Sequence, residues 1–397
     1  MKDVILLGST GSIGKSTLNV LKKNKKKFRV RLLSTNSNIK KVYKQAVEFN
    51  VKKVVIFDQI KFVKYKNYFK KKKIKVFFNI TDALKKNKKK VHFVISAISG
   101  IEGLEPTLNI IKYTKNLGIA NKESIICGWK FLDKELKKYK TNFIPLDSEH
   151  FSIWSLLKSE NIHNVKKIYL TASGGPFLYK QLSEIHDISP IEALKHPNWK
   201  MGKKISIDSA TMMNKIFEVI EAKKIFNINI NKLEILIHPK SHIHAIVHFK
   251  TGLTKFIAHN TTMEIPILNS LFEKNEVFEF NNYDFDYTKF NGVNFIKPNL
   301  NNFPLLRILN YNFNNTFFEI ILVTINDTLV KLYLEKSIKY ISIHKLLIKL
   351  LKKPYFVKYY DTSPKNINDI KNMVNKVKKY LLKYSNFNEK FSWENCL

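Results

Sequence analysis

Acidic residues stand at two places in the sequence where they could bind a divalent metal ion. Asp147 and Glu149 follow an apolar segment at residues 142–146, and residues two apart in an extended chain project to the same side. Glu218 lies further along, in a segment with a helical pattern. Mg²⁺ and Mn²⁺ prefer carboxylate oxygens, so these three residues are the predicted metal ligands. The alternative for Asp147 and Glu149 is a solvated acidic turn.

Around Glu218 the sequence predicts a loop followed by a helix. Residues 196–206 contain Pro, Asn, Trp, Gly and Lys without an apolar period, which is typical of a mobile loop over a pocket. Asp208 and Ser209 are good N-cap residues and precede an apolar-periodic run to Phe226. We therefore expect the helix to begin at Asp208 and Ser209.

The start of this helix carries groups that suit an anionic ligand. Asn214 and Lys215 lie four and three residues before Glu218, so the three side chains share one helix face. Free N–H groups at a helix N-terminus, together with Ser209, favour phosphate binding. The alternative is that Lys215, Glu218 and Glu221 form only surface pairs.

Near the N-terminus, residues 2–14 (KDVILLGSTGSIG) predict a dinucleotide-binding turn. An apolar strand pattern leads to Gly8, Gly11 and Gly14, and a helical run follows at residues 13–23. Glycines at this point permit a tight turn and let backbone N–H groups approach a pyrophosphate at the helix N-terminus. The spacing is G-x-x-G-x-x-G, whereas the commoner fingerprint is G-x-G-x-x-G.

The residues after the second predicted strand favour NADP over NAD. An NAD-dependent enzyme usually offers Asp or Glu to the ribose hydroxyls at this point, but the first acidic residue after residues 29–34 is Glu48. The polar and basic residues that stand there instead are Thr35, Asn36, Ser37, Asn38, Lys40 and Lys41. Such groups could take a 2′-phosphate, and Ser37 or Asn38 could also cap a helix.

Two shorter segments add candidate residues. Lys122 follows a predicted strand and precedes a helical run, which is also the usual position of a solvated cap. Ser173 belongs to a Ser-Gly-Gly-Pro turn after a strand, and its hydroxyl and the neighbouring amides could hold a phosphate. A simple tight turn is the alternative for Ser173.

The alternation of strand-like and helical runs predicts an α/β fold with a parallel sheet. We expect an N-terminal Rossmann-like dinucleotide-binding domain (residues 1–145), a central α/β catalytic domain (146–285) and a C-terminal helical domain (286–397). The predicted strands of the first domain cover residues 3–7, 29–34, 54–57, 75–78, 91–96, 117–120 and 142–144. Strands expected to be antiparallel cover residues 233–238, 244–249 and 253–258, and the last predicted helices cover residues 316–336, 342–352 and 366–383.

The strong positive charge does not by itself indicate nucleic-acid binding. The formal net charge is +37 over 397 residues, but the lysines are scattered and arginine occurs only at Arg29, Arg31 and Arg307. Surfaces that read bases or clamp phosphates favour clustered arginine. We therefore predict no specific nucleic-acid partner, although weak nonspecific binding at low salt is expected.

Cysteine content and hydropathy point to the cytoplasm. Cys127 and Cys396 are too few for a disulfide scaffold or a metal cluster, which fits a reducing compartment. A strand pattern begins at Asp3, and no uncharged apolar run of about 18 residues occurs. We therefore expect no signal peptide, no membrane span and a cytoplasmic protein.

Six segments occur in one order over roughly residues 1–270: GSTGSIG, IANKES, PLDSEH, SGGPF, HPNWKMGKKISIDSATMMNK and HPKSHIH. In this ordered series the chain resembles the 1-deoxy-D-xylulose 5-phosphate reductoisomerase family. The resemblance implies an enzyme that depends on NADPH and on Mg²⁺ or Mn²⁺. It implies conversion of 1-deoxy-D-xylulose 5-phosphate into 2-C-methyl-D-erythritol 4-phosphate, a step of non-mevalonate isoprenoid biosynthesis, by a homodimer.

The resemblance also implies roles for residues at matching positions. The catalytic residues would be Lys122, Glu149, His196 and Glu218. The substrate would contact Lys122, Ser148, Glu149, Ser173, His196, Ser209, Asn214, Lys215 and Glu218. NADPH would contact Gly8, Thr10, Gly11, Ser12, Ile13, Asn36, Ser37, Asn38, Asn121, Glu123 and Gly202. The metal ligands would be Asp147, Glu149 and Glu218, with Trp199 and Met201 on the closing loop and His150 and His244 in supporting positions.

The sequence departs from the family pattern at two segments. Residues 36–38 read Asn-Ser-Asn where the family usually carries Gly-Lys-Asn, so the 2′-phosphate contact would fall to Lys40 or Lys41. Residues 259–266 read HNTTMEIP and lack the family's aspartate and arginine, which predicts weaker loop closure or stability.

Two other functions remain as alternatives to the reductoisomerase. A different NADP-dependent reductase would turn over without a divalent metal, and the three carboxylates argue against it. An inactive remnant of the enzyme would keep the fold without turnover. A noncatalytic nucleic-acid-binding protein is disfavoured by the scattered lysines.

Overall fold

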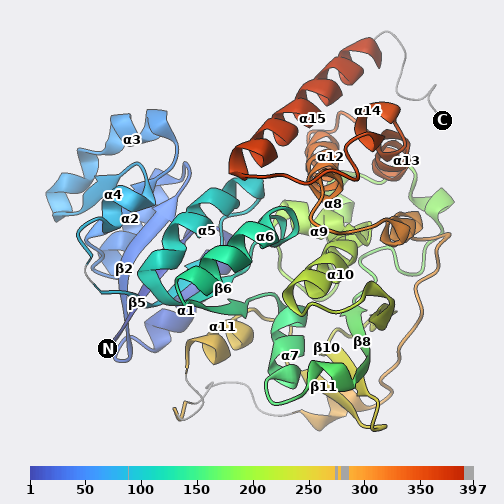
Figure 1. Cartoon of the computed structure of the whole chain (residues 1–397), viewed down its shortest axis with the longest axis horizontal. Helices are drawn as coiled ribbons and strands as arrows, with labels where there is room; N and C mark the ends of the chain where they lie inside the picture. The colour runs from blue at the N-terminus through green and yellow to red at the C-terminus, as the bar shows by residue number, and fades with distance from the viewer. Residues whose placement is uncertain (88, 273–275, 279–285, 389–397) are drawn as a thin grey trace. The chain divides into compact units, whose positions relative to one another are not determined.

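The computed structural model describes residues 1–87, 89–272, 276–278 and 286–388, which form two compact units (Figure 1). The first unit comprises Met1–Ile125, Lys130–Lys158 and Thr262–Asp286, and the second comprises Ile126–Trp129, Ser159–Thr261 and Tyr287–Leu397. The division into three domains at residues 145 and 285 stays a prediction. Residue 285 and Cys396 lie outside the described residues.

The first unit contains a seven-stranded sheet in the order β4-β3-β2-β1-β5-β6-β7, and all its strand pairs are parallel. Its strands are β1 (Lys2–Leu7), β2 (Phe28–Thr35), β3 (Lys53–Ile56), β4 (Lys75–Phe77), β5 (Val91–Ser96), β6 (Thr114–Ile119) and β7 (Asn142–Pro145). The predicted parallel sheet is thus confirmed.

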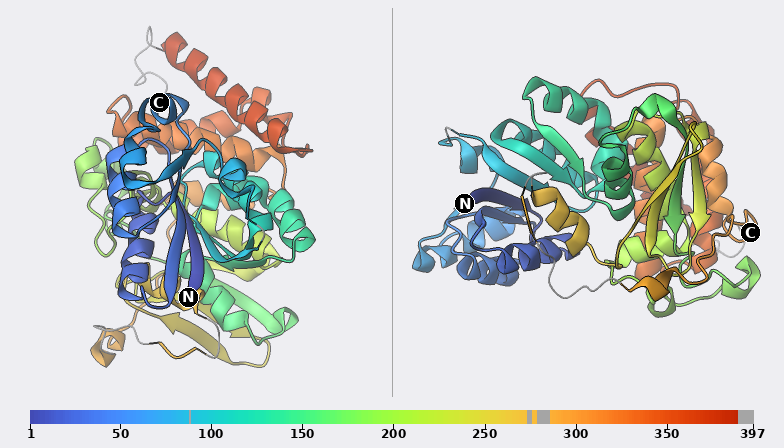
Figure 2. Two further views of the ribbon diagram at one scale, coloured as in Figure 1. Left: turned by 90° about the vertical axis from the view of Figure 1, so that its left-hand side faces the viewer. Right: turned by 90° about the horizontal axis from the view of Figure 1, so that it is seen from below.

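Helices flank this sheet (Figure 2). The helices that contribute to this unit are α1 (Ser12–Lys23), α2 (Ile39–Glu48), α3 (Gln59–Tyr65), α4 (Ile80–Leu84), α5 (Leu104–Ile110), α6 (Lys122–Lys138), α7 (Ser148–Leu157) and α11 (Glu264–Leu271). The central strand β1 reads Val-Ile-Leu-Leu at residues 4–7, and all four side chains are fully buried. A continuous apolar run of this kind is expected where a parallel sheet is covered on both faces.

Helix α11 belongs to the first unit although the segment Ser159–Thr261 of the second unit comes before it in the sequence. Ile267 and Leu268 are buried in the core of the first unit. Beyond the helix, the ring of Phe272 packs edge-on against Phe28, with centroids 5.2 Å apart. Glu264 lies 3.3 Å from the ammonium of Lys23 on α1. The first unit is therefore complete only with this distant segment.

The second unit contains a four-stranded sheet in the order β11-β10-β8-β9. Its strands are β8 (Val165–Ala172), β9 (Leu233–Ile237), β10 (Ile243–Phe249) and β11 (Thr254–Ala258). β10 pairs antiparallel with both β8 and β11. The expectation that β9 pairs in the same way was wrong, because β9 lies parallel to β8. Parallel neighbours need a long crossover, and the helices between residues 190 and 225 supply it.

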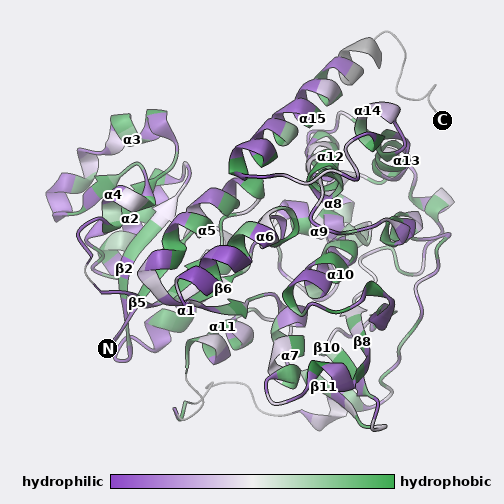
Figure 3. Cartoon of the chain, in the orientation of Figure 1, coloured by the Kyte–Doolittle hydropathy of each residue, from purple (hydrophilic) through white to green (hydrophobic). Residues whose placement is uncertain are grey.

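The remaining helices of the second unit include the C-terminal helical region that the sequence predicts. They are α8 (Pro190–Ala193), α9 (Lys203–Ala210), α10 (Met213–Ile225), α12 (Phe317–Leu334), α13 (Tyr340–Leu351), α14 (Pro354–Val357) and α15 (Ile367–Asn388). Polar and apolar residues alternate along α15 (Figure 3), and its buried residues include Ile370, Val374 and Val377. Among the described helices, none combines the length and apolar character that crossing a bilayer requires.

A buried ion pair ties α10 to α12. Lys224 Nζ lies 3.0 Å from Glu319 Oε1, and the two side chains are 3% and 0% exposed. The carboxylate of Glu319 also accepts hydrogen bonds from the backbone N–H groups of Asn315 and Thr316, each at 2.8 Å. Glu319 therefore both caps α12 and neutralises a lysine of α10.

Candidate active site

The predicted dinucleotide turn lies at the point where the strand order of the first sheet reverses. β1 has β2 on one side and β5 on the other, and ligands of such sheets bind at the carboxyl ends of the strands at this point. Gly8 has a φ of +78°, and a Cβ there would lie 2.5 Å from the carbonyl oxygen of Ala97. A Cβ on Gly14 would lie 2.4 Å from the carbonyl oxygen of Gly8. Both positions therefore require glycine.

Other predicted cofactor residues lie around this turn. Gly11 is the N-cap of α1 and makes no side-chain cap bond, and Ser12 and Ile13 form the first turn. The hydroxyl oxygens of Thr10 and Thr35 are 3.1 Å apart, which joins the turn to the end of β2. Asn38 caps α2 by accepting a hydrogen bond from the N–H of Lys41 at 3.3 Å. The predicted capping role is thus confirmed for Asn38.

Asn121 holds two loops of the first unit together. Its Oδ1 accepts a hydrogen bond from the N–H of Ser124 at 2.6 Å, which caps α6. Its Nδ2 donates to the carbonyl oxygens of Ile98 and Gly100, the latter at 2.7 Å. Asn121 thereby fixes the chain after β5 against the start of α6. Glu123, in the first turn of α6, is buried.

Lys122 forms an ion pair with Asp147. His150 Nδ1 lies 3.4 Å from the same carboxylate oxygen, Oδ2 of Asp147. Burial alone would raise the pKa of Asp147, but the charge of Lys122 and the contact with His150 hold that pKa well below its usual range. Asp147 is therefore ionised at any working pH. Lys122 is not the solvated cap of the alternative, because it is 8% exposed and paired.

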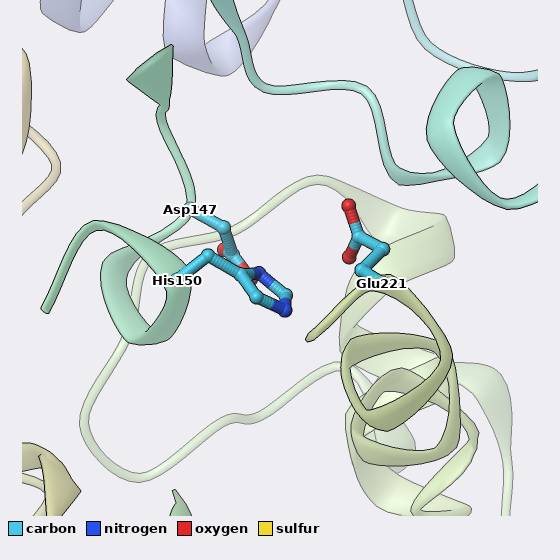
Figure 4. A group of neighbouring side chains, drawn as sticks. All are labelled: Asp147, His150 and Glu221. Carbon is cyan, nitrogen blue, oxygen red and sulfur yellow. The ribbon is translucent and has the colours of Figure 1, made fainter. Parts of the chain in front are cut away.

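From their spacing we expected Asp147 and Glu149 to lie in one extended segment, and this expectation was wrong. Asp147 is the N-cap of α7, and Ser148 and Glu149 form its first turn. The buried hydroxyl of Ser148 donates to the carboxylate of Glu149. Figure 4 draws Asp147 just before α7, His150 on α7 and Glu221 on α10.

In the second unit, Ser173 pairs with His196. Ser173 Oγ lies 2.9 Å from His196 Nε2 and accepts a hydrogen bond from the N–H of Gly175 at 3.0 Å. His196 Nδ1 accepts from the N–H groups of Asn198 and Trp199, at 3.2 and 3.0 Å. Because Nδ1 is an acceptor, the proton of the neutral ring is on Nε2. Burial lowers the pKa of His196 to about 4, so the ring is neutral near pH 7.

A cavity of about 410 Å³ opens beside Ser173. Its charged lining residues are Lys180, Glu192 and Lys195, and the Gly-Gly-Pro backbone of the predicted phosphate turn contributes Gly175. Gly174 and Gly175 have φ values of +85° and +68°. The turn therefore presents backbone amides in a conformation that glycine favours.

The predicted loop at residues 196–206 is shorter than expected. α9 begins at Lys203 with Gly202 as its N-cap, and the space around the Gly202 Cβ position is open. Asn198 Nδ2 donates to Pro239 O at 2.6 Å and to Ser241 Oγ at 3.0 Å. These bonds anchor the loop at its centre.

The expected helix start at Asp208 and Ser209 was wrong. Both residues lie inside α9, and α10 begins after Met212, which has a φ of +62°. Asp208 is buried, and it accepts a hydrogen bond from Asn326 Nδ2 on α12 at 2.9 Å. Its carboxylate also lies 3.2 Å from Nζ of Lys204, within α9, and is not at the start of a helix. The left-handed backbone conformation of Met212 changes the direction of the chain between the two helices. Such a conformation costs of order 1–3 kcal/mol in a residue other than glycine.

The α10 residues form a buried cluster. Lys215 is 3% exposed and Glu218 is 1% exposed, and the ammonium donates to the carboxylate. Asn214 Nδ2 donates to the other oxygen of Glu218 at 2.6 Å. The alternative of ordinary surface pairs is therefore wrong. Buried charges on a helix face are rare unless they are paired and hydrogen-bonded.

The chain is similar in sequence to known 1-deoxy-D-xylulose 5-phosphate reductoisomerases. A 1-deoxy-D-xylulose 5-phosphate reductoisomerase of Pelagibacter ubique is 50% identical over 378 residues, which cover 94% of this chain and 97% of that protein. A reductoisomerase of Clostridium acetobutylicum is 35% identical over 388 residues, with 96% and 98% covered. The chain belongs to the 1-deoxy-D-xylulose 5-phosphate reductoisomerase family. Sequence models of this family match residues 4–128 (reductoisomerase), 143–226 (reductoisomerase C-terminal domain) and 259–380 (DXP reductoisomerase C-terminal domain) of the chain.

Solved reductoisomerase structures have the same fold. The Zymomonas mobilis enzyme in complex with NADPH has a TM-score of 0.83 and 31% identity, with 95% of this chain and 97% of that chain covered. A reductoisomerase in complex with NADPH, fosmidomycin and magnesium has a TM-score of 0.87 and 28% identity, with 96% and 97% covered. The predicted family, fold class and enzyme class, an NADP-dependent oxidoreductase, are thus confirmed. The predicted activity, NADPH and a divalent metal ion are confirmed at the level of this family.

Sequence reasoning did not predict the burial of Glu221. We considered it only for surface pairing, yet it is 2% exposed on α10. It lies one turn after Glu218, and its carboxylate is a candidate metal ligand. The spacing of three residues between two glutamates was the available signal.

Proposed function

We propose that Asp147, Glu149 and Glu218 hold the divalent ion of the reductoisomerase reaction in this chain. Each offers one carboxylate oxygen, and an all-oxygen set fits Mg²⁺ or Mn²⁺. The observation that carries the proposal is the buried Glu218, which Lys215 and Asn214 hold in place. The ion, when bound, polarises the substrate carbonyl so that the carbon skeleton can rearrange.

The phosphate of the substrate is proposed to bind Ser173, His196, Ser209, Asn214 and Lys215. The neutral His196 ring donates from Nε2, and Lys215 supplies a buried positive charge. Charge-assisted bonds to phosphate are strong where water is excluded. Binding at this remote group would supply the energy that orders the loop over the substrate.

At the reacting end, we assign roles to Lys122, Ser148 and Glu149. Lys122 is buried and paired with Asp147, so it can donate to a substrate oxygen without a large desolvation penalty. Ser148 orients the carboxylate of Glu149. The proposed contacts to NADPH are those of the predicted cofactor set: Gly8, Thr10, Gly11, Ser12, Ile13, Asn36, Ser37, Asn38, Asn121, Glu123 and Gly202.

Replacement of Glu218 by Gln tests the metal site. We expect metal-dependent NADPH oxidation with 1-deoxy-D-xylulose 5-phosphate to fall more than about a hundredfold, because even residues behind metal ligands cost 10–100-fold. Calorimetric titration with Mn²⁺ should show weaker binding. Glu234→Gln is the matched control, since Glu234 pairs with Lys167 on the half-exposed surface of the same unit. Equal activity of Glu218→Gln and wild type would refute the assignment. A folded wild type without turnover would indicate an inactive remnant.

We further propose a cytoplasmic homodimer. The exposed edge strand β11 supports self-association, since Phe256 on this strand is 50% exposed and an unpaired edge is a template for pairing. The low cysteine content supports a reducing compartment. Light scattering would give the mass in solution, and a monomer at micromolar concentration would refute the dimer.

A further inference from the structure

The adenosine side of the proposed NADPH site has no positive charge where the chain leaves β2. Residues 34–38 read Ser-Thr-Asn-Ser-Asn. The side chain of Asn38 caps α2, and Thr35 Oγ1 accepts a hydrogen bond from the N–H of Asn38 at 3.2 Å. The phosphate that distinguishes NADPH from NADH needs cations or several donors. Neighbouring elements must therefore supply the charge.

Lys41 brings a charge to this place from the first turn of α2. Its Nζ donates to the carbonyl oxygen of Thr10 at 2.8 Å, so the side chain lies against the dinucleotide turn. The side chain is half-buried. The neighbouring Lys40 is exposed. Of the two lysines considered from the sequence, Lys41 is the one that contacts the turn.

Lys15 brings a second charge, from the first turns of α1. Burial and, second, the adjacent ammonium of Lys15 lower the pKa of Lys41 to about 8. Two ammonium groups this close repel each other, and an anion between them would relieve the repulsion. Lys61 on α3 is a third lysine nearby, but its Nζ donates to Ser37 O at 3.2 Å.

We propose that Lys15 and Lys41 together bind the 2′-phosphate of NADPH and set the preference of this chain for NADPH over NADH. This inference rests on the proposed function. It assigns to α1 and α2 a contact that the loop at residues 36–38 does not provide. The first acidic residues after this loop are Glu48, which ends α2 and pairs with Lys22 at 2.7 Å, and Asp58, whose carboxylate caps α3 by accepting from the N–H of Lys61 at 2.9 Å.

Binding measurements on Lys41→Met and Lys15→Met test the proposal without catalysis. We would titrate each variant and the wild type calorimetrically with NADPH, NADH, adenosine 2′,5′-bisphosphate and 5′-AMP. A hydrogen bond to a charged group corresponds to about tenfold to a hundredfold in affinity. We expect each variant to lose that factor for NADPH and for the bisphosphate, and to keep its affinity for NADH and 5′-AMP. The double variant should bind NADPH and NADH nearly equally.

Lys40→Met is the matched control, because Lys40 lies on the same helix and is exposed. It should leave all four affinities within about twofold. Equal losses for NADPH and NADH in Lys41→Met would overturn the proposal and give Lys41 a structural role. Unchanged NADPH binding in both variants would also overturn it. A wild type that binds NADPH normally but fails to turn over would refute the proposed function and leave these affinities as the test of the lysines.

Discussion

His344 predicts a specific pH dependence of stability. It lies on α13 and is fully buried beside Tyr340, with ring centroids 5.4 Å apart. Neither ring nitrogen has a hydrogen-bond partner among the described residues. Burial lowers the pKa of His344 from 6.5 to about 4. The ring is therefore neutral in the folded protein at any pH at which the enzyme would work.

The direction of this pH dependence follows from the protons that the folded and the unfolded chain bind. Between pH 6.5 and about pH 4 the unfolded chain protonates at His344 and the folded chain does not. The stability that depends on a neutral His344 is therefore fully present above pH 6.5. The free energy of unfolding falls as the pH falls from 6.5 to about 4. At about 1.4 kcal/mol per pKa unit, the loss from this one residue is about 3 kcal/mol.

Replacement of His344 by Leu removes this loss. We would measure urea unfolding of wild type and variant at about pH 7 and about pH 4, and compare the changes in the free energy of unfolding. The wild type should lose about 3 kcal/mol more than His344→Leu. His163→Leu is the control, because His163 is exposed, and it should lose as much as the wild type. An equal loss in wild type and His344→Leu would refute the reasoning.

Two further pairs of substitutions test a buried ion pair and the packing of a glycine. Glu319→Ala leaves Lys224 buried and unpaired, so the free energy of unfolding should fall by about 3–5 kcal/mol in urea titrations. Glu335→Ala removes the exposed partner of an i,i+4 pair on the same helix and should cost under about 0.5 kcal/mol; equal costs would contradict the burial argument. Gly14→Ala places a methyl group against the backbone of the dinucleotide turn and should cost about 3 kcal/mol or more. Gly202→Ala enters open space and should be tolerated, and similar melting curves for the two alanine variants would refute the steric reasoning.

Much of the fold was predictable because its signals are local. The alternation of strand-like and helical runs predicted the parallel sheet, and the glycines after the first strand predicted the dinucleotide turn. The break between α9 and α10 was not predictable, because aspartate is a residue type that often caps helices and Asp208 therefore suggested a helix start. Its burial depends on Asn326, which lies far away in the sequence. Aspartate suits both a helix cap and a buried hydrogen-bonded position, and only its partners in the folded structure show which of the two it occupies.

The candidate site shows the same limit. Residue types and motif order made Lys122, Ser173 and Lys215 candidates, although a solvated cap, a tight turn and surface pairs were the alternatives. Their burial could not be predicted, and burial is what changes their chemistry. His344 gave no signal at all, because a lone histidine on an apolar helix is ordinary until packing removes its partners.

The return of α11 to the first unit has a consequence for synthesis on the ribosome. The core around Phe28 is covered by Ile267, Leu268 and Phe272, which follow residue 158 by roughly a hundred residues. At about 5–20 residues per second, the nascent chain carries this uncovered apolar face for roughly 5–20 s. The first unit therefore matures only after the segment Ser159–Thr261 of the second unit has been made. A fragment that ends near residue 158 would expose the same face permanently and would aggregate on expression.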